Sequence, residues 1–251
     1  MRSHLTISNA IFALVLIWLG IIGFIRGDFA PGLAPVPESL PARQVVAYLC
    51  AVLCISCGAG LLVRQTATIA ARILFIWLLL WLFLLRVPWM FVEFGIGTWW
   101  AASSTAVMAA AAWALYLSLT GGKGISLARV LFGLGLIPMG LAHFLYLEAT
   151  APLVPAWMLW PIFWSYFTGA AFIAAGVGTI TGIFERLAAV LITLQIGLLT
   201  VLIWVPRVVA GSVTAFQWGE FVVSILLTAC AWVIADSYRG EAWFSIRKGS
   251  A

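Results

Sequence analysis

Three cysteines are the first residues in this 251-residue sequence whose types and spacing could do chemistry. Cys50, Cys54 and Cys57 would share one face of a helix, and Cys54-Ile-Ser-Cys57 has the C-x-x-C spacing of redox pairs. Such a pair needs a stabilised thiolate and access to an exchange partner, and the middle of an apolar helix offers neither. We therefore expect small packing residues, and a break in the helix would favour the redox interpretation instead.

His143 is the histidine that lies within a long apolar run. It lies about one turn from the end of that run, beyond the kink expected at Pro138. An ionisable group inside a membrane is a functional candidate by default. The alternative is a histidine at the membrane interface that bonds a loop carbonyl or Glu148.

Two arginine and tryptophan pairs flank Val-Pro dipeptides, in Arg86-Val-Pro-Trp89 and in Trp204-Val-Pro-Arg207. Each pair is expected to end an apolar helix, because proline disrupts the helix interior. One interpretation is that arginine snorkels to the interface while tryptophan lies at headgroup level. The other is a cationic, aromatic-lined pocket for an anionic or quinone-like headgroup.

The composition requires a membrane environment for these residues. Of the chain, 65% is hydrophobic and 8% is charged, whereas soluble domains carry about 25% charged residues. The formal net charge of +5 does not indicate nucleic-acid binding, because the basic residues lie between apolar runs and form no patch. Their positions indicate membrane orientation instead.

Apolar runs long enough to span a bilayer recur along the whole chain, so we predict an all-α membrane protein with eight transmembrane helices. The run from residue 7 to residue 25 exceeds the length of a signal-peptide core, and we interpret it as the first helix. A β-barrel is excluded because the runs are continuous rather than alternating. The predicted spans are 8–26, 44–63, 66–87, 99–118, 126–147, 160–181, 186–206 and 218–237.

The distribution of lysine and arginine predicts that both termini lie in the cytoplasm, because cytoplasmic segments carry the excess. With that orientation the inner segments hold nine basic residues and the outer segments four. The inner residues are Arg2, Arg64, Arg72, Lys123, Arg129, Arg186, Arg239, Arg247 and Lys248, and the outer ones are Arg26, Arg43, Arg86 and Arg207.

Tryptophan is concentrated on the predicted outer side, which holds eight of the fourteen. An ordinary aromatic belt marks both faces of a membrane protein. The excess predicts either a site for a flat apolar ligand or a protein contact, and a thick belt beneath long outer loops is the alternative. The eight are Trp89, Trp99, Trp100, Trp157, Trp160, Trp164, Trp204 and Trp218.

The two halves of the chain resemble each other at a separation of 118 residues. In the first helix a separation of 117 matches Gly23 with Gly140 and Arg26 with His143. We therefore predict two parallel repeats, residues 1–120 and 121–251, packed side by side as four-helix bundles, each with a long outer loop after its first helix. The other informative matches are Val36-Pro37 with Val154-Pro155, Tyr48 with Tyr166, Gly58 with Gly176, Gly60 with Gly178, Ala70-Ala71 with Ala188-Ala189, Val87-Pro88 with Val205-Pro206, and Trp100 with Trp218.

Over residues 126–206 the second half has a first helix with glycines followed by a histidine and an aromatic, a Val-Pro-x-Trp loop, a helix with tyrosine and small residues, and a turn with arginine and an Ala-Ala pair. The positions are Gly140, His143, Phe144, Val154, Pro155, Trp157, Tyr166, Gly169, Gly176, Arg186, Ala188 and Ala189. In these features it resembles the DoxX-like membrane proteins. The resemblance implies tandem four-helix units in the cytoplasmic membrane of a prokaryote, where some relatives are subunits of thiosulfate:quinone oxidoreductase and others are tied to thiol redox homeostasis. The usual acidic residue of the second helix is absent, since residues 170–172 are Ala-Ala-Phe.

Three functions compete on this basis. The first is a membrane subunit of a redox complex that binds a quinone in an outer pocket and contacts another protein subunit on its outer face. The second is a non-enzymatic scaffold or assembly factor, and the third, less favoured, is a transporter. No metal site, resident cofactor or catalytic residue is predicted within the chain. The residues predicted to bind the ligand are Arg26, Arg86, Trp89, His143, Trp157, Tyr166, Trp204 and Arg207.

Overall fold

The structure, a computed structural model, describes residues 6–211 and 213–246. The described chain is helical, and eight of its helices are long and apolar enough to cross a membrane. The prediction of a multi-pass all-α protein is therefore confirmed. The eight are α1 (Ile7–Arg26), α2 (Arg43–Leu62), α3 to α4 (Ala67–Val92), α5 (Ile96–Thr120), α6 (Ile125–Leu145), α8 (Pro161–Thr181), α9 to α10 (Glu185–Val209) and α11 (Ala215–Ser237).

The sequence predicted that the third and seventh spans end at their prolines, but both spans continue beyond them. A π-helical turn precedes each proline, η1 (Leu82–Arg86) before Pro88 and η3 (Thr200–Trp204) before Pro206. Helix then continues as α4 (Val87–Val92) and α10 (Val205–Val209). A proline ring clashes with the carbonyl four residues earlier, and the wider π-turn accommodates it without ending the helix.

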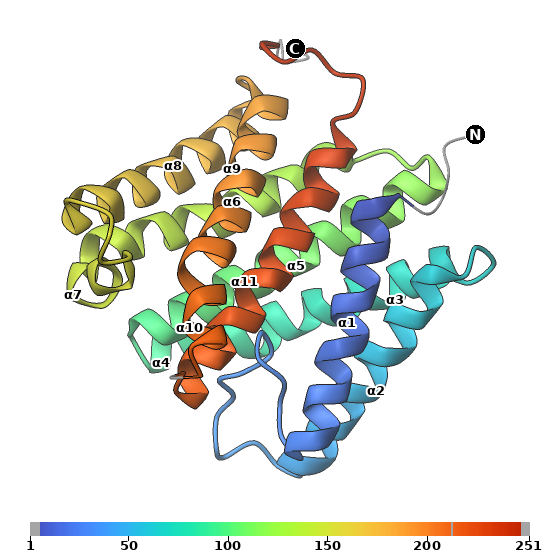
Figure 1. Ribbon diagram of the computed structural model, residues 1–251. Helices are drawn as coiled ribbons and strands as arrows, with labels where there is room; N and C mark the ends of the chain where they lie inside the picture. The colour runs from blue at the N-terminus through green and yellow to red at the C-terminus, as the bar shows by residue number, and fades with distance from the viewer. Residues whose placement is uncertain (1–5, 212, 247–251) are drawn as a thin grey trace.

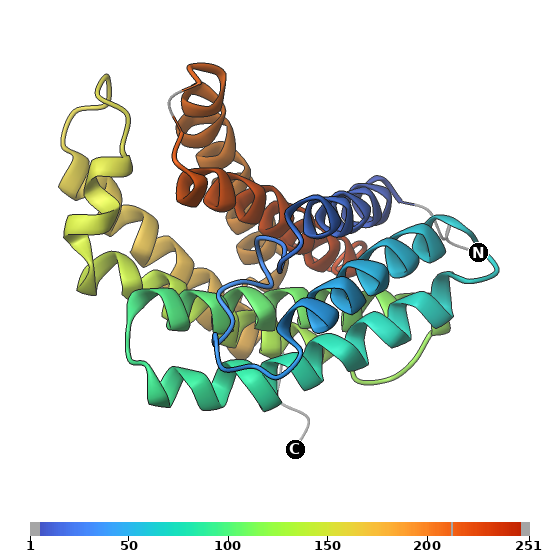
Figure 2. The ribbon, with the colours of Figure 1, turned by 90° about the horizontal axis from the view of Figure 1, so that it is seen from below.

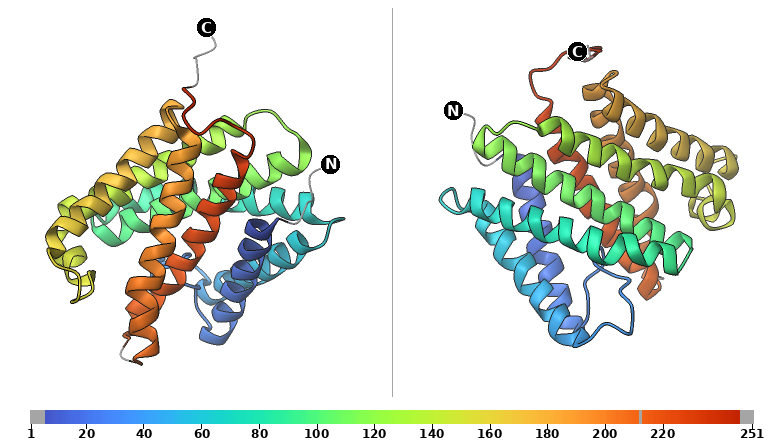
Figure 3. Two further views of the ribbon diagram at one scale, coloured as in Figure 1. Left: turned by 45° about the horizontal axis from the view of Figure 1, so that its top comes forward. Right: turned by 180° about the vertical axis from the view of Figure 1, so that it is seen from behind.

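Helix packing follows the chain order and then closes on itself. Each spanning helix packs on the next, from α1 to α2, α3, α5, α6, α8, α9 and α11, and α11 returns to α1. α5 and α11 also pack on each other through the centre (Figures 1 and 3). Alanine side chains from Ala109 to Ala112 are fully buried in α5, which allows close approach by its neighbours. Each half is thus completed by a helix of the other.

Element boundaries recur along the chain at an interval of 118 residues. The interval separates the starts of α2 and α8, of α3 and α9, and of η1 and η3. Ala42 and Trp160, also 118 residues apart, both adopt left-handed backbone conformations immediately before α2 and α8. Non-glycine residues rarely adopt this conformation, so its recurrence at matched positions is informative. The predicted division after residue 120 coincides with the end of α5.

The first helices of the two halves match at a different interval, 120 residues. Phe24 stacks on Tyr48 with ring centroids 5.6 Å apart, and Phe144 stacks on Tyr166 with centroids 5.2 Å apart. The tyrosines are separated by 118 residues and the phenylalanines by 120. The stretch between the first helix and the second is therefore two residues shorter in the second half than in the first.

This packing corrects the predicted match of Arg26 with His143. A Cβ at Gly23 would contact Ala51, and a Cβ at Gly169 would lie 2.8 Å from the Cβ of His143. Gly169 is the counterpart of Ala51 at 118 residues, so His143 is the counterpart of Gly23. Gly169 has no side chain, so it leaves room for the larger side chain of His143. A separation of 117 aligned two glycines in sequence but not in the packing.

The helix ends define two faces of the molecule. The loop face carries the two long connections, residues 27–42 and 146–160, and the terminus face carries the start of α1 and the end of α11 (Figure 1). The loop face has Arg26, Arg43, Arg86 and Arg207, and the terminus face has Arg64, Arg72, Lys123, Arg129, Arg186 and Arg239.

Candidate functional site

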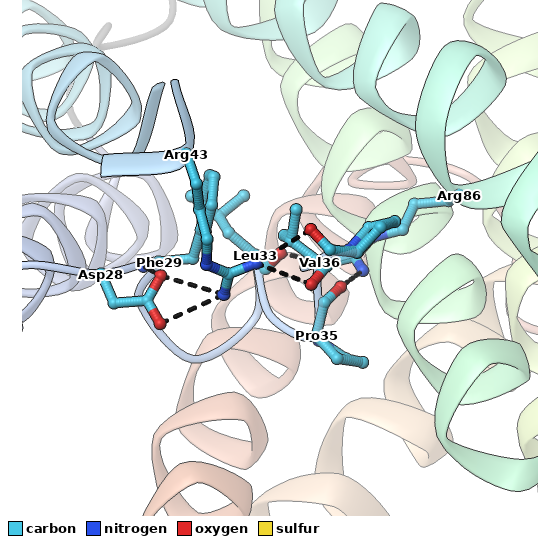
Figure 4. Close-up of polar contacts among 8 residues, drawn as sticks. Asp28, Phe29, Leu33, Pro35, Val36, Arg43 and Arg86 are labelled. Atoms are coloured by element: carbon cyan, nitrogen blue, oxygen red, sulfur yellow. Dashed lines mark hydrogen bonds and ion pairs between the residues drawn. The ribbon is translucent and has the colours of Figure 1, made fainter. Parts of the chain in front are cut away.

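Arg86 is buried and binds the first long connection. Its guanidinium donates to the carbonyl oxygens of Leu33, Ala34 and Pro35, the second at 3.2 Å (Figure 4). The side chain is about as buried as any in the protein, with 1% of the residue exposed. Only Nε lacks a partner. Arg86 therefore orders the connection, and its charge does not face an open pocket.

Arg43 holds the same connection from the start of α2 (Figure 4). It donates to both carboxylate oxygens of Asp28 at 3.1 Å and to the carbonyl oxygens of Val36 and Pro37 at 2.8 and 3.1 Å. Burial alone would raise the pKa of Asp28. The N–H of Phe29 and the cation of Arg43 outweigh burial, so this pKa lies below its usual value. Sequence reasoning missed Arg43, because partners 15 residues apart follow no helical period.

The first connection is part of the core rather than a surface loop. Phe29, Ala30, Leu33 and Val36 are each at most 5% exposed. Gly32 has a positive φ of 91°, and a Cβ there would lie 2.9 Å from Leu226 of α11. Viewed from below, the connection lies beside α11, whereas the second connection projects away (Figure 2). The two arginines thus hold a plug of chain between α1 and α11.

Arg207 binds the second connection in a comparable way. It donates to the carbonyl oxygens of Ile203 at 2.9 Å, Leu153 at 3.0 Å and Pro152 at 3.4 Å. Pro152 and Leu153 lie 118 residues after Ala34 and Pro35, which Arg86 binds. The arginines stand on opposite sides of Val-Pro yet bind matched carbonyls. Neither is a free cation for a ligand.

His143 lies between two aromatic rings at the junction of α5, α6 and α8. Its ring stacks on Phe172 with centroids 5.7 Å apart and lies 6.0 Å from that of Trp100. Nδ1 is 2.9 Å from the carbonyl oxygen of Met139 and must donate to it, because a carbonyl only accepts. The neutral ring then presents Nε2 as an acceptor. The partner is a carbonyl of its own helix, neither a loop carbonyl nor Glu148.

Three buried donors without hydrogen-bond partners lie on α5, the helix whose Trp100 ring is beside this histidine. The indole nitrogens of Trp99 and Trp100 and the hydroxyl of Ser103 are buried atoms with no hydrogen-bond partner. Trp100 and Ser103 are one helical turn apart, and the Ser103 backbone approaches Gly135 of α6. Buried polar groups without partners are uncommon, and each calls for an explanation. Of the three, Trp100 combines an unpartnered indole N–H with a ring that lies beside His143.

The eight predicted site residues do not form one pocket. Arg26 lines a shallow hollow of about 370 Å³ with Trp218, and a groove of about 680 Å³ between α8 and α9 contains none of the eight. Tyr166 stacks on Phe144, and Trp157 is 69% exposed on the second connection. Trp204 is buried, with Arg207 5.9 Å from its ring, and Trp89 is partly exposed.

The cysteines are buried and free, and α2 continues through them without a break. Cys54, the first member of the C-x-x-C pair, is 0% exposed. The structural condition for the redox interpretation, an interrupted helix, is therefore not met, and packing remains the better explanation.

A polar cluster on α11 was not identified from the sequence. Thr200, Ser224 and Thr228 meet where η3 packs on α11, with 2.6 Å between the Thr200 and Ser224 hydroxyls. Glu220 lies one turn before Ser224 on α11. The i, i+4, i+8 spacing of Glu220, Ser224 and Thr228 was the available signal.

Comparison with known proteins adds no assignment. No family model, curated protein or solved structure matches this chain. Functional inference therefore depends on the residues themselves.

Proposed function

We propose that this protein is an integral subunit of a membrane redox complex and that it binds a quinone or quinol beside His143. The observation that carries the proposal is the position of His143 between the rings of Trp100 and Phe172, with the buried indole N–H of Trp100 left without a partner. Flat rings stack well on aromatic side chains. The site differs from the predicted arginine pocket, because Arg86 and Arg207 already bind loop carbonyls.

The polar atoms suit both redox states of such a ligand. The indole N–H of Trp100 and the hydroxyl of Ser103 can donate to a quinone carbonyl oxygen. Nε2 of His143 can accept from a quinol hydroxyl, since Nδ1 is bonded to Met139. Electron transfer itself would be carried out by a cofactor on a partner subunit, and this chain would bind and orient the lipophile.

The experiment is calorimetric titration of the protein in nanodiscs with a short-chain ubiquinone analogue. Trp100→Phe keeps the ring and removes one donor, and we expect about tenfold weaker binding, the equivalent of one hydrogen bond. His143→Ala should weaken binding further. Trp218→Phe is the matched control, because Trp218 lies 118 residues after Trp100 and its indole nitrogen is not among the unpartnered atoms. Unchanged affinity in both site variants would rule the proposal out.

The second candidate function, a scaffold or assembly factor, is favoured by the second connection. Trp157, Leu159 and Trp160 are 69%, 72% and 73% exposed there, where a protein partner on the loop face could cover them. Under this function a stoichiometric protein would co-purify with the wild type, the Trp157→Ala/Trp160→Ala variant would lose it, and no quinone would bind.

The proposal also covers the duplication of the chain, its orientation in the membrane and its origin. A tandem duplication is supported by the 118-residue interval between helices, π-turns and arginine-bound carbonyls. Cytoplasmic termini are supported by the excess of basic residues on the terminus face. A DoxX-like origin and a prokaryotic cytoplasmic membrane would fit both.

A further inference from the structure

Arg26 is the loop-face arginine whose charge the chain does not use. Arg86 and Arg207 donate to carbonyl oxygens of the two long connections, and Arg43 holds both carboxylate oxygens of Asp28. Arg26 is the last residue of α1 and is exposed. Among the described residues it makes no hydrogen bond or ion pair. The N–H groups of its guanidinium are therefore available to a ligand.

Arg26 lines a hollow between the loop-face ends of α1 and α11. The two helices spread apart toward this face, and the hollow between them has a volume of about 370 Å³ (Figures 1 and 3). Its other lining residues are apolar or aromatic: Ile22 and Ile25 of α1, and Ala215 and Trp218 of α11. Ile22 lies one helical turn before Arg26, about 6 Å farther from the loop face. The hollow thus has a cation at its loop-face end and apolar surface at greater depth.

The second half forms the matching helix crossing without a cation. Tyr146 is the counterpart of Arg26 at the 120-residue interval of the first helices, and Trp100 is the counterpart of Trp218 at 118 residues. The Trp100 ring lies beside the ring of His143 there. Packing of the two helices therefore does not require Arg26. A charged side chain at the end of a membrane span that packing does not need is a candidate for binding.

The charge and the apolar surface together select the occupant of the hollow. A lipid without net charge offers no excess negative charge to the guanidinium, and a small inorganic anion would leave the apolar walls uncovered. An anionic phospholipid satisfies both parts, because its phosphodiester lies at headgroup level while its acyl chain extends toward the membrane centre. Arginine also binds phosphate oxygens through two parallel N–H donors, which gives the contact a defined geometry.

We propose that this hollow binds one anionic phospholipid from the leaflet at the loop face. The phosphodiester accepts hydrogen bonds from the guanidinium of Arg26, and an acyl chain lies against Ile22 and Trp218. The site is independent of the proposed quinone site, because it lies between α1 and α11 and shares no residue with it.

Native mass spectrometry of the delipidated protein in detergent tests the site with phosphatidylglycerol and phosphatidylcholine of identical acyl chains. The wild type should retain one phosphatidylglycerol in preference to phosphatidylcholine. Arg26→Gln should weaken this binding about tenfold, which corresponds to the loss of a hydrogen-bonded charge contact. Ala215→Trp should weaken it as well, because the new ring fills the hollow while Arg26 stays in place.

Arg64→Gln is the matched control. Arg64 is also exposed and makes no hydrogen bond or ion pair with another described residue, but it lies on the terminus face and does not line the hollow. Its removal takes away the same charge and should leave the bound phosphatidylglycerol in place.

Four outcomes would overturn the proposal. Equal retention of the two lipids, or unchanged binding in Arg26→Gln, would show that the guanidinium does not select the headgroup. An equal loss in Arg64→Gln would indicate general charge attraction, and displacement of the lipid by excess inorganic phosphate would indicate a site for a soluble anion. Both arginines are exposed, so the comparison of Arg26→Gln with Arg64→Gln remains decisive even where Ala215→Trp fails to fold.

Discussion

At the scale of single residues, the arginines show how burial changes the meaning of a charge. Arg86 lies between a tryptophan-rich helix end and a connection, where sequence alone allows either snorkelling or ligand binding. Three backbone carbonyls around its guanidinium decide for a structural role. His143 differs, because its bond to Met139 leaves one ring nitrogen for another partner. Arg86 and His143 therefore differ in whether a polar atom of the side chain is free to bind a ligand, and residue type alone does not reveal this.

Arg86→Met should destabilise the protein markedly. It leaves three buried carbonyl groups without their donor, and we expect a loss on the order of 3 kcal/mol. Thermal unfolding in detergent, followed by circular dichroism, would report the change. Arg26→Met is the control, because Arg26 is exposed and makes no such bonds, so its effect should stay within about 0.5 kcal/mol. Equal stability of the two variants would contradict the structural role of Arg86.

At the scale of elements, close crossings and π-turns position the side chains. α1 packs on α2, and α6 on α8, through small residues that bring backbones together. The π-turns carry both spans past their prolines, and they place Arg86 and Thr200 at the loop-face part of the membrane. A sequence pattern detects the prolines and glycines, but whether a proline ends or merely widens a helix depends on what packs around it.

Gly58→Ala tests the crossing of α1 and α2. A Cβ there would lie 2.6 Å from the backbone oxygen of Ala13, which cannot move aside easily. We expect a loss of about 1–3 kcal/mol from overpacking. Gly97→Ala, in α5, meets no atom within 4 Å and should be neutral or stabilising by up to about 1 kcal/mol. Thermal unfolding of both variants checks the contrast, and a tolerated Gly58→Ala would argue against so close a crossing.

At the scale of the whole molecule, the exchange of helix contacts joins the halves. α5 packs on α6 and α11 on α1, so neither group of four helices closes alone. The plug of residues 27–42 adds to this joint, because Gly32 approaches Leu226. The two halves therefore form one assembly, but they differ in the polar side chains that they contain. The second contains His143 and the hydroxyl cluster of Thr200, Ser224 and Thr228, where the first has Gly23 and apolar packing.

The orientation of this assembly can be measured with a fluorescent protein fused to the C-terminus in a bacterial host. We expect fluorescence, because the excess of basic residues on the terminus face predicts a cytoplasmic position and the fluorescent protein matures there. A matched alkaline phosphatase fusion, which is active only outside the cytoplasm, should be inactive. The reverse pair of results would invert the loop face and contradict the predicted orientation.

The sequence by itself determined the membrane environment, the eight helices and most of their boundaries. Continuous apolar runs with few charges have one stable outcome in lipid, because each helix satisfies its own backbone. The 118-residue interval was also readable, since matched Pro, Gly, Tyr and Trp residues are rare enough to align. Only the tertiary structure decided which polar atoms remain free. It assigned Arg86 and Arg207 to carbonyls, shifted the match of His143 to Gly23, and brought Thr200 to Ser224. Such contacts join helices far apart in sequence, so no local pattern encodes them.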